Sequence, residues 1–296
     1  MADTHQFDVT NLFGVKDFVA VVTGGGTGIG LMAAQALSAN GAKVYITGRR
    51  MGVLVNAAEK HQPARSSGQI IPIGPCDVRS KDDLERLVTD LSNKEKHIDL
   101  LVCSAGISGP KAEPEPVEAD DLKARLWNNE DAQDWQENFD TNVTSVYFTT
   151  VAFLPLLQAG MRPKGPLEPY SSSVITISSM SGIMRHAQGH FSYNTAKGAT
   201  IQLTKLMSAE FQKAGIRVNS IAPGYFPSEM TAKGSDDRQK SHVSPEKIQD
   251  KGHVPLMRAG REEEMGMTVL YLAKNQYVNG EIIAVDGGVL NVLAGR

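Results

Sequence analysis

A phenol and an ammonium stand four residues apart in the segment Tyr193-Asn194-Thr195-Ala196-Lys197. On a helix, residues i and i+4 lie on one face, so Tyr193 and Lys197 are expected side by side. A phenol has an ordinary pKa of about 10 and exchanges protons poorly at neutral pH. A neighbouring cation stabilises the phenolate and brings its pKa toward the working range of general acid–base catalysis. The pair predicts a catalytic tyrosine assisted by a lysine, although such a spacing also occurs by chance on exposed helix faces.

A run of hydroxyl groups precedes this pair, in Ser178-Ser179-Met180-Ser181-Gly182. The run begins at the last residue of the predicted strand 173–178, so its hydroxyls are expected at the end of that strand. A hydroxyl there can donate a hydrogen bond to a substrate carbonyl, or it can simply form a turn. Either Ser178 or Ser179 could take the first role.

A glycine-rich loop, Thr23-Gly24-Gly25-Gly26-Thr27-Gly28-Ile29-Gly30, follows the first apolar segment and opens a helical stretch. Glycines allow a tight turn and let the backbone approach a pyrophosphate without Cβ clashes. The helix N-terminus then offers unpaired N–H groups and the positive end of its dipole. Gly28-x-Gly30-x-x-Ala33 also matches the dinucleotide fingerprint. The position of the loop between a strand and a helix favours a dinucleotide site over an ordinary glycine-rich turn.

Apolar, β-branched runs alternate with amphipathic stretches along the whole chain. The predicted strands are residues 18–23, 43–47, 69–73, 98–103, 173–178, 216–221 and 282–285. The predicted helices are residues 29–40, 51–61, 80–92, 134–159, 193–214 and 261–273. Strands this apolar are typical of a sheet covered by helices on both faces. The alternation predicts an α/β fold, a Rossmann-type doubly wound parallel sheet of about seven strands. We expect a single domain over residues 14–296, after an N-terminal extension of residues 1–13.

Three stretches depart from the alternation. Residues 111–134 are acidic and contain prolines, and residues 160–173 are rich in Gly, Pro and Ser. We expect both to be surface excursions. Residues 225–257 are polar with little periodicity. Because they follow a segment expected at the ligand-binding edge of the sheet, we expect them to form a mobile substrate lid with few core anchors.

The spacing Thr-Gly-x-x-x-Gly-x-Gly resembles that of the short-chain dehydrogenase/reductase family rather than the medium-chain dehydrogenases. The resemblance extends from about residue 14 to 290. Its Ser-x-x-Gly pattern selects Ser179 as the catalytic serine, with Ser178 as the alternative. Asn142, in Asn138-Phe139-Asp140-Thr141-Asn142-Val143, matches the family's fourth catalytic residue, which holds a water beside the lysine. A capping or solvated asparagine is the alternative. The resemblance thus implies a tetrad of Asn142, Ser179, Tyr193 and Lys197.

The same resemblance implies further cofactor contacts. Asp77-Val78 follows the third predicted strand, where the family places an acidic side chain near the adenine ring, and Ser104-Ala105-Gly106 matches the family's Asn-Ala-Gly with serine in place of asparagine. That asparagine braces the central sheet, so the replacement puts local rigidity in question. Pro223-Gly224 matches the segment beside the nicotinamide, and Ser228 replaces a phosphate-contacting threonine. The expected cofactor-binding residues are Gly24, Thr27, Gly28, Ile29, Gly30, Arg49, Asp77, Val78, Ser104, Ala105, Gly106, Tyr193, Lys197, Pro223, Gly224 and Ser228.

The residues after the second predicted strand favour NADP(H) over NAD(H). NAD-dependent enzymes of this fold place an acidic residue there, which binds the adenosine ribose and repels a 2′-phosphate. Here Gly48 stands at that position and Arg49 follows. A guanidinium binds a phosphate with two charge-assisted hydrogen bonds. The alternative is that Arg49 and Arg50 are solvated residues at the start of the next helix. Thr27 weakens the case slightly, because some NADP-dependent relatives carry a basic residue in the glycine loop.

Near the C-terminus, Pro255-Leu256-x-Arg258-Ala259-Gly260 and Val285-Asp286-Gly287-Gly288 resemble 3-oxoacyl-acyl-carrier-protein reductases and related ketone reductases. The expected activity is NADP(H)-dependent reduction of a ketone, or oxidation of the corresponding secondary alcohol, in a small-molecule substrate. Two alternatives remain open. One is an NAD-dependent alcohol dehydrogenase, and the other is a catalytically silent regulator or scaffold on the same fold.

Composition sets limits on other functions. The chain has 296 residues, of which 41% are hydrophobic and 21% charged, with a formal net charge of −3. This balance gives no support for a nucleic-acid or membrane partner. Cys76, Cys103 and the seven histidines show no metal-ligand spacing, so no metal is expected, and the cysteines are expected to be reduced. The start lacks a secretory pattern and the end is no peroxisomal signal, so we expect a cytoplasmic protein.

Quaternary structure is suggested by the two long predicted helices, 134–159 and 193–214. Each is apolar on more than one side, whereas a sheet covers only one stripe of a helix. Family members pair these helices across a two-fold axis. We expect a homo-oligomer, a tetramer or a dimer.

Overall fold

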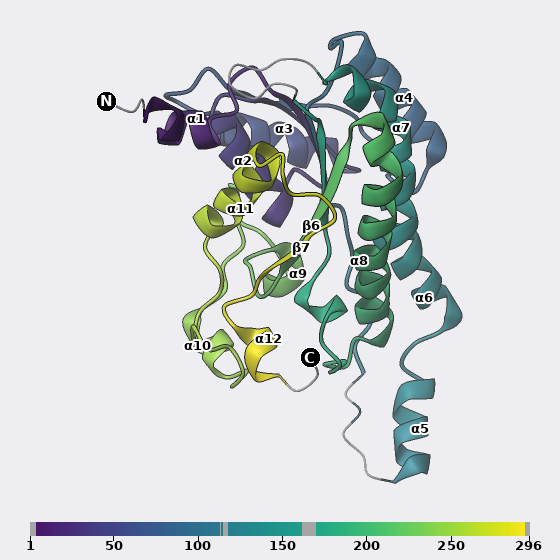
Figure 1. Ribbon diagram of the computed structural model, residues 1–296. Coiled ribbons are helices and arrows are strands. Elements are labelled where there is room, and N and C mark those ends of the chain that lie inside the picture. Colours follow the sequence, from purple (N-terminus) through teal and green to yellow (C-terminus); the bar gives the residue numbers. More distant parts are fainter. Residues whose placement is uncertain (1–3, 113, 115–117, 162–169, 294–296) are drawn as a thin grey trace.

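The computed structural model describes residues 4–112, 114, 118–161 and 170–293. Its centre is one sheet with the strand order β3-β2-β1-β4-β5-β6-β7 (Figure 1). All neighbouring strands pair in parallel. The strands are β1 (Val19–Thr23), β2 (Lys43–Thr47), β3 (Gln69–Pro72), β4 (Leu100–Cys103), β5 (Ser173–Ile177), β6 (Arg217–Pro223) and β7 (Ile282–Val285). The predicted single-domain doubly wound fold is confirmed, and each strand lies within a few residues of its expected place.

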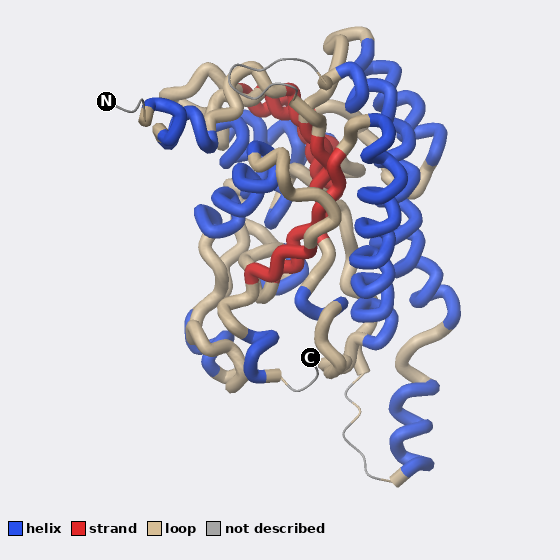
Figure 2. Tube along the Cα trace, in the orientation of Figure 1, coloured by secondary structure: helices blue, strands red, loops and turns tan. Residues whose placement is uncertain are grey.

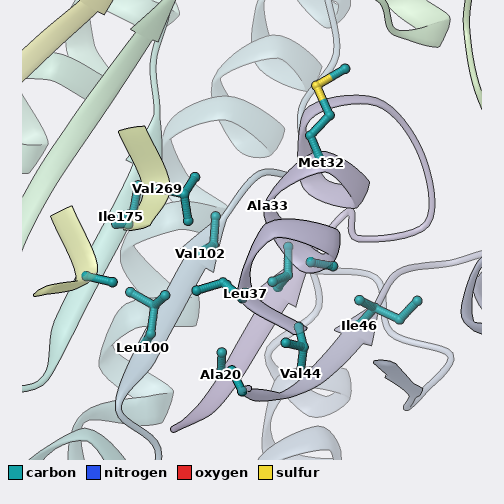
Figure 3. Packing of buried hydrophobic residues seen from close by; sticks show 14 of the residues in the cluster. Ala20, Met32, Ala33, Leu37, Val44, Ile46, Leu100, Val102, Ile175 and Val269 are labelled. Atoms are coloured by element: carbon teal, nitrogen blue, oxygen red, sulfur yellow. The ribbon is translucent and has the colours of Figure 1, made fainter. Parts of the chain in front are cut away.

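Helices cover both faces of the sheet (Figures 1 and 2). One layer contains α2 (Gly28–Ala39), α3 (Met51–Lys60) and α11 (Glu262–Lys274), and the other contains α4 (Lys81–Ser92), α7 (Ser145–Ala159) and α8 (Phe191–Phe211). Alternate residues of one strand pack against the two helix layers. In β1, Ala20 and Val22 join the α2 side, whereas Val19 and Val21 join the α7 side. Figure 3 shows the first cluster, in which Leu37 packs among side chains of several strands. This double burial explains why the strands are apolar throughout.

The predicted helix 134–159 is interrupted. It consists of α6 (Ala132–Phe139), a π-helical turn η2 (Asp140–Thr144) and α7. An Asp131–Asp134 capping box starts α6 before the predicted first residue. A π-turn places an extra residue in the helix and commonly marks a functional site. Here it contains Asn142, which was predicted from the family resemblance.

Short helical segments complete the chain. They are η1 (His5–Phe7), α1 (Val9–Phe13), α5 (Ala119–Trp127), η3 (Met180–Gly182), η4 (Gln212–Ala214), α9 (Glu229–Ala232), α10 (Pro245–Gln249) and α12 (Val289–Val292). The expected excursion 111–134 contains α5, which has no buried residue and stands away from the sheet (Figure 1). Most of the expected excursion 160–173 lies outside the described residues. Its last part returns to the core, because Tyr170 is fully buried against Phe18.

The segment 225–257 is anchored to the core at a few separate residues. Phe226, Ile248 and Val254 are all buried. Ile248, in α10, packs with Val289 and Leu290 of α12 in a third hydrophobic cluster. Few core anchors were expected, and these three buried apolar side chains are separated by long partly exposed stretches of the segment.

Candidate active site

A cleft of about 740 Å³ opens at the carboxyl ends of the strands. Its walls are the loops after β1 to β6, where doubly wound folds bind ligands. All of the predicted cofactor-binding residues line this cleft. Three predicted catalytic residues, Ser179, Tyr193 and Lys197, line the same cleft. The fourth, Asn142, lies behind the wall and is 1% exposed.

Tyr193 and Lys197 occupy one face of α8, near its N-terminus. The Lys197 ammonium lies 5.7 Å from the Tyr193 ring centroid. It donates a hydrogen bond of 2.8 Å to the Ile177 carbonyl at the end of β5. Burial lowers the pKa of Lys197 to about 8. The side-by-side placement expected from the i, i+4 spacing is present.

The direction of the tyrosine pKa differs from the expectation. Burial raises the pKa of Tyr193, and a hydrogen bond with the Ser179 side chain opposes that rise. The predicted lowering by the lysine does not dominate, because desolvation by the surrounding protein disfavours the phenolate and Lys197 points its ammonium to the Ile177 carbonyl. The geometry therefore favours a protonated Tyr193 that can donate to an oxygen.

The two candidate serines have different environments. The Ser178 hydroxyl donates to the Ile221 carbonyl at 3.1 Å and accepts from the Ser220 hydroxyl at 2.8 Å. Those contacts tie β5 to β6 inside the sheet. The Ser179 hydroxyl instead accepts from the Ser181 N–H at 3.1 Å and contacts the Tyr193 phenol. Ser179, rather than Ser178, therefore faces the same reacting position as the tyrosine.

Asn142 connects the π-turn to the loop after β4. Its side chain donates to the Ile107 carbonyl at 2.9 Å and accepts from the Ile107 N–H at 3.3 Å. Its own carbonyl accepts a bond of 2.8 Å from Thr200 of α8. A Cβ added at Gly106 would lie 2.8 Å from Asn142 Oδ1 and 3.6 Å from Lys197 Nζ. Asn142 and Lys197 thus flank Gly106, and a larger residue there would displace the Asn142 side chain.

The glycine loop turns tightly from β1 into α2. Gly24 and Gly28 have φ values of 64° and 51°, which favour glycine. A Cβ at Gly30 would lie 2.2 Å from the Gly24 carbonyl oxygen. A Cβ at Gly28 would lie 3.0 Å from Ser228 Cβ, so the glycine loop and Ser228 face each other closely. The N-terminus of α2 and the Ser228 hydroxyl supply the kind of donors that bind a pyrophosphate.

A hydroxyl braces the loop where the family's asparagine is replaced. Thr23 Oγ1 accepts from the N–H groups of Ser104 and Ala105 at 3.1 and 3.3 Å. It also donates to the Val102 carbonyl at 3.5 Å. Thr23 therefore ties β1 to the loop after β4. Sequence reasoning missed this role, although the position of Thr23 at the end of a predicted strand was a usable signal.

The far end of the cleft has a basic rim. Arg49 and Arg50 line it, as do Asp77 and Arg79, which form an ion pair of 2.8 Å. Hydrogen bonds from Arg79 lower the pKa of Asp77. A Cβ added at Gly48 would meet only Leu54 Cδ2, at 3.9 Å. The position where NAD-dependent enzymes carry an acid is therefore open space beside an arginine. The donor set and this space fit a dinucleotide with a 2′-phosphate.

Sequence reasoning also missed a polar network beside the cleft. The Tyr225 hydroxyl lies 2.9 Å from His253 Nε2 and accepts from the Gln188 side chain at 3.2 Å. This network links the loop before α8 to the end of the 225–257 segment.

Within the described ranges, no group of three or more His, Cys, Asp or Glu side chains could hold a metal ion. The part of the chain that is described also contains no helix long and apolar enough to span a bilayer.

Comparisons with known proteins identify relatives of this chain. The family model described as enoyl-(acyl carrier protein) reductase matches residues 24–290. The short-chain dehydrogenase/reductase PhomF of Diaporthe leptostromiformis is 40% identical over 98% of this chain and 97% of its own length. The rhamnolipids-biosynthesis 3-oxoacyl-[acyl-carrier-protein] reductase of Pseudomonas aeruginosa is 33% identical over 93% of this chain and 97% of its own length.

Solved structures show the same relationship. The Pseudomonas aeruginosa RhlG/NADP active-site complex superposes with a TM-score of 0.74 at 31% identity, over 94% of this chain and 98% of that one. From its sequence and its fold, the chain belongs to the short-chain dehydrogenase/reductase family, oxidoreductases that act on CH–OH and C=O groups with a nicotinamide cofactor.

Proposed function

We propose that this chain is an NADP(H)-dependent reductase of ketones, with Tyr193 as the proton donor and with the reverse oxidation of a secondary alcohol as the same reaction run backwards. The observation that carries the proposal is the convergence of the Ser179 and Tyr193 hydroxyls beside Lys197 at one end of the cleft. When bound, the nicotinamide supplies the hydride for the carbonyl carbon.

The side chains have separate roles in this proposal. Ser179 donates a hydrogen bond to the carbonyl oxygen, where negative charge develops during reduction. Tyr193 donates a proton to that oxygen. Lys197 holds the nicotinamide ribose and keeps positive charge next to the phenol. Asn142 is a positioning residue, since it fixes the Gly106–Ile107 backbone beside Lys197.

The preference for NADP(H) is part of the proposal. Its support is the open space at Gly48, the exposed guanidinium of Arg49 on the cleft wall, and the NADP named in the similar Pseudomonas complex. The proposed substrates carry a ketone. Because one relative is a 3-oxoacyl reductase, a 3-oxoacyl thioester is a first substrate to assay.

Turnover separates this proposal from its alternatives. Purified protein is incubated with NADPH or NADH and a panel of ketones that includes a 3-oxoacyl thioester, and consumption of the reduced cofactor is recorded. We expect turnover with NADPH. Turnover with NADH alone would favour the NAD-dependent alcohol dehydrogenase. Cofactor binding without turnover on any panel member would favour the silent regulator.

We also propose that the protein is a homo-oligomer, formed through α7 and α8. Tyr147 on α7 is 42% exposed and Leu206 on α8 is 56% exposed, so each helix presents a large apolar side chain outside the domain core. Light scattering at micromolar concentration should report a dimer or a tetramer. A monomer under those conditions contradicts this assignment.

A further inference from the structure

An ion pair crosses the rim of the cleft at its basic end. Arg50 Nη2 and Nη1 donate to the two carboxylate oxygens of Glu229 at 2.7 and 3.3 Å. Arg50 follows β2 and Glu229 begins α9, and both residues line the cleft. The Ser235 hydroxyl donates to Glu229 at 3.0 Å. Arg50 lowers the pKa of Glu229, so the carboxylate is charged at neutral pH.

The ion pair belongs to a longer contact between residues 50–61, which are α3 and its two flanking residues, and the segment 228–238. The Asn56 side chain donates to the Asp237 carbonyl at 2.9 Å. His61 Nε2 lies 2.7 Å from the Arg238 carbonyl oxygen. A Ser228–Thr231 capping box fixes the start of α9, so Glu229 is held at a defined place. The geometry of the pair is thus supported on both sides, unlike that of most exposed ion pairs.

Arg49 and Arg50 consequently differ although they are neighbours. Arg49 lines the cleft and makes no ion pair or hydrogen bond with the residues that the structure describes, and its charge helps to lower the pKa of Asp77, which is paired with Arg79. Arg50 has both terminal nitrogens engaged by Glu229. The Arg50–Glu229 and Arg79–Asp77 pairs are each electrically neutral, so the remaining positive charge at this rim is that of Arg49.

We propose that Glu229 is a specificity-determining residue that sets how strongly the cleft favours a 2′-phosphate. Glu229 holds Arg50 in an ion pair and cancels its charge, so Arg49 is the guanidinium that binds the 2′-phosphate. The inference rests on the proposed NADP(H) dependence. Glu229 of α9, far along the chain from the two arginines, thus adjusts the preference for NADP(H) over NAD(H).

A double-mutant cycle on cofactor binding tests the proposal. The dissociation constants of NADPH and NADH are measured by calorimetry for the wild type, Glu229→Gln, Arg50→Ala and the double variant. Glu229→Gln adds one net positive charge and should improve the NADPH-to-NADH affinity ratio by roughly fivefold, the effect of one unit charge at about 8 Å in a dielectric of about 40. Arg50→Ala leaves Glu229 unpaired and should worsen the ratio by a similar factor. The double variant is neutral here and should return close to the wild-type ratio.

Two results would overturn the role of Glu229. If Arg50 is itself a phosphate ligand, the double variant will stay as weak toward NADPH as Arg50→Ala. If the pair only holds the fold, all three variants will change both affinities equally, leaving the ratio unchanged. Lys213→Ala is the matched control, because it breaks an exposed ion pair with Glu210 and removes one charge outside the cleft lining.

The failure of this inference is distinct from that of the proposed function. A wild type that binds NADH more tightly than NADPH contradicts the proposed cofactor, and the ratio changes among the variants still decide the role of Glu229. Raising the salt concentration should reduce the ratio changes, because they act through charge at a solvated rim.

Discussion

Gly48→Asp should shift the cofactor preference from NADPH toward NADH. The position has room, since a Cβ there meets only Leu54 Cδ2 at 3.9 Å, and its φ is not in the left-handed region. A carboxylate about 5 Å from a 2′-phosphate costs about 1–3 kcal/mol for dielectrics of about 80 to 20. The same carboxylate can accept hydrogen bonds from the ribose hydroxyls of NADH, each worth about 1.5–3 kcal/mol before desolvation of the carboxylate.

The assay is a titration of both cofactors with the wild type, Gly48→Asp and Gly48→Asn. The asparagine variant has nearly the same size without the charge, so it separates repulsion from bulk. Arg49→Ala is the companion change, which should weaken NADPH by about 1.5–3 kcal/mol and leave NADH little changed. Equal losses for both cofactors in Gly48→Asp, or a wild type that already prefers NADH, would refute the reasoning.

Three further tests concern the two serines, the segment 225–257 and Lys197. Ser179→Ala should lower kcat by about 10²-fold, the scale of one oxyanion donor. Ser178→Ala should chiefly lower the free energy of unfolding, by about 1 kcal/mol, because the Ser178 hydroxyl forms its hydrogen bonds within the sheet. Equal losses of kcat in the two variants would contradict the assignment of Ser179 as the catalytic serine. We propose that residues 225–257 are a lid, so limited proteolysis there should slow with cofactor and substrate, and cleavage that ignores both would leave a plain surface loop. Burial lowers the Lys197 pKa to about 8 from 10.5, so unfolded protein binds more protons between those pH values. Between pH 8 and 10.5 the free energy of unfolding of the wild type should therefore rise by up to about 3 kcal/mol relative to that of Lys197→Met. If the unfolding free energies of the two proteins change with pH in parallel, this prediction is contradicted.

The sheet could be predicted from the sequence because burial on both faces leaves long apolar strands. Val19 to Val22 alternate between two clusters, so every one of them must be apolar. The glycine loop was predictable for a related reason. Gly24 has a positive φ and a Cβ at Gly30 would clash with the backbone, so both positions require glycine. A requirement for one residue type is visible in the sequence itself.

Other features depend on contacts between distant segments. The π-turn at Asn142 is stabilised by bonds to Ile107 and Thr200, which no local period reveals. The direction of the Tyr193 pKa depends on how deeply the fold buries the phenol, and the i, i+4 spacing contains no information on depth. The helix α5 was missed because no residue of it is buried, and so nothing imposes a periodic apolar face.

The central claim is that Tyr193 donates the proton during carbonyl reduction. The most direct measurement compares the wild type with Tyr193→Phe on the best ketone of the panel, together with the NADPH dissociation constant of each protein. The variant removes the phenolic oxygen and little else, so NADPH affinity should be nearly unchanged while kcat falls by at least ~10²-fold. A Tyr193→Phe protein that binds NADPH and reduces the ketone at the wild-type rate would contradict the account.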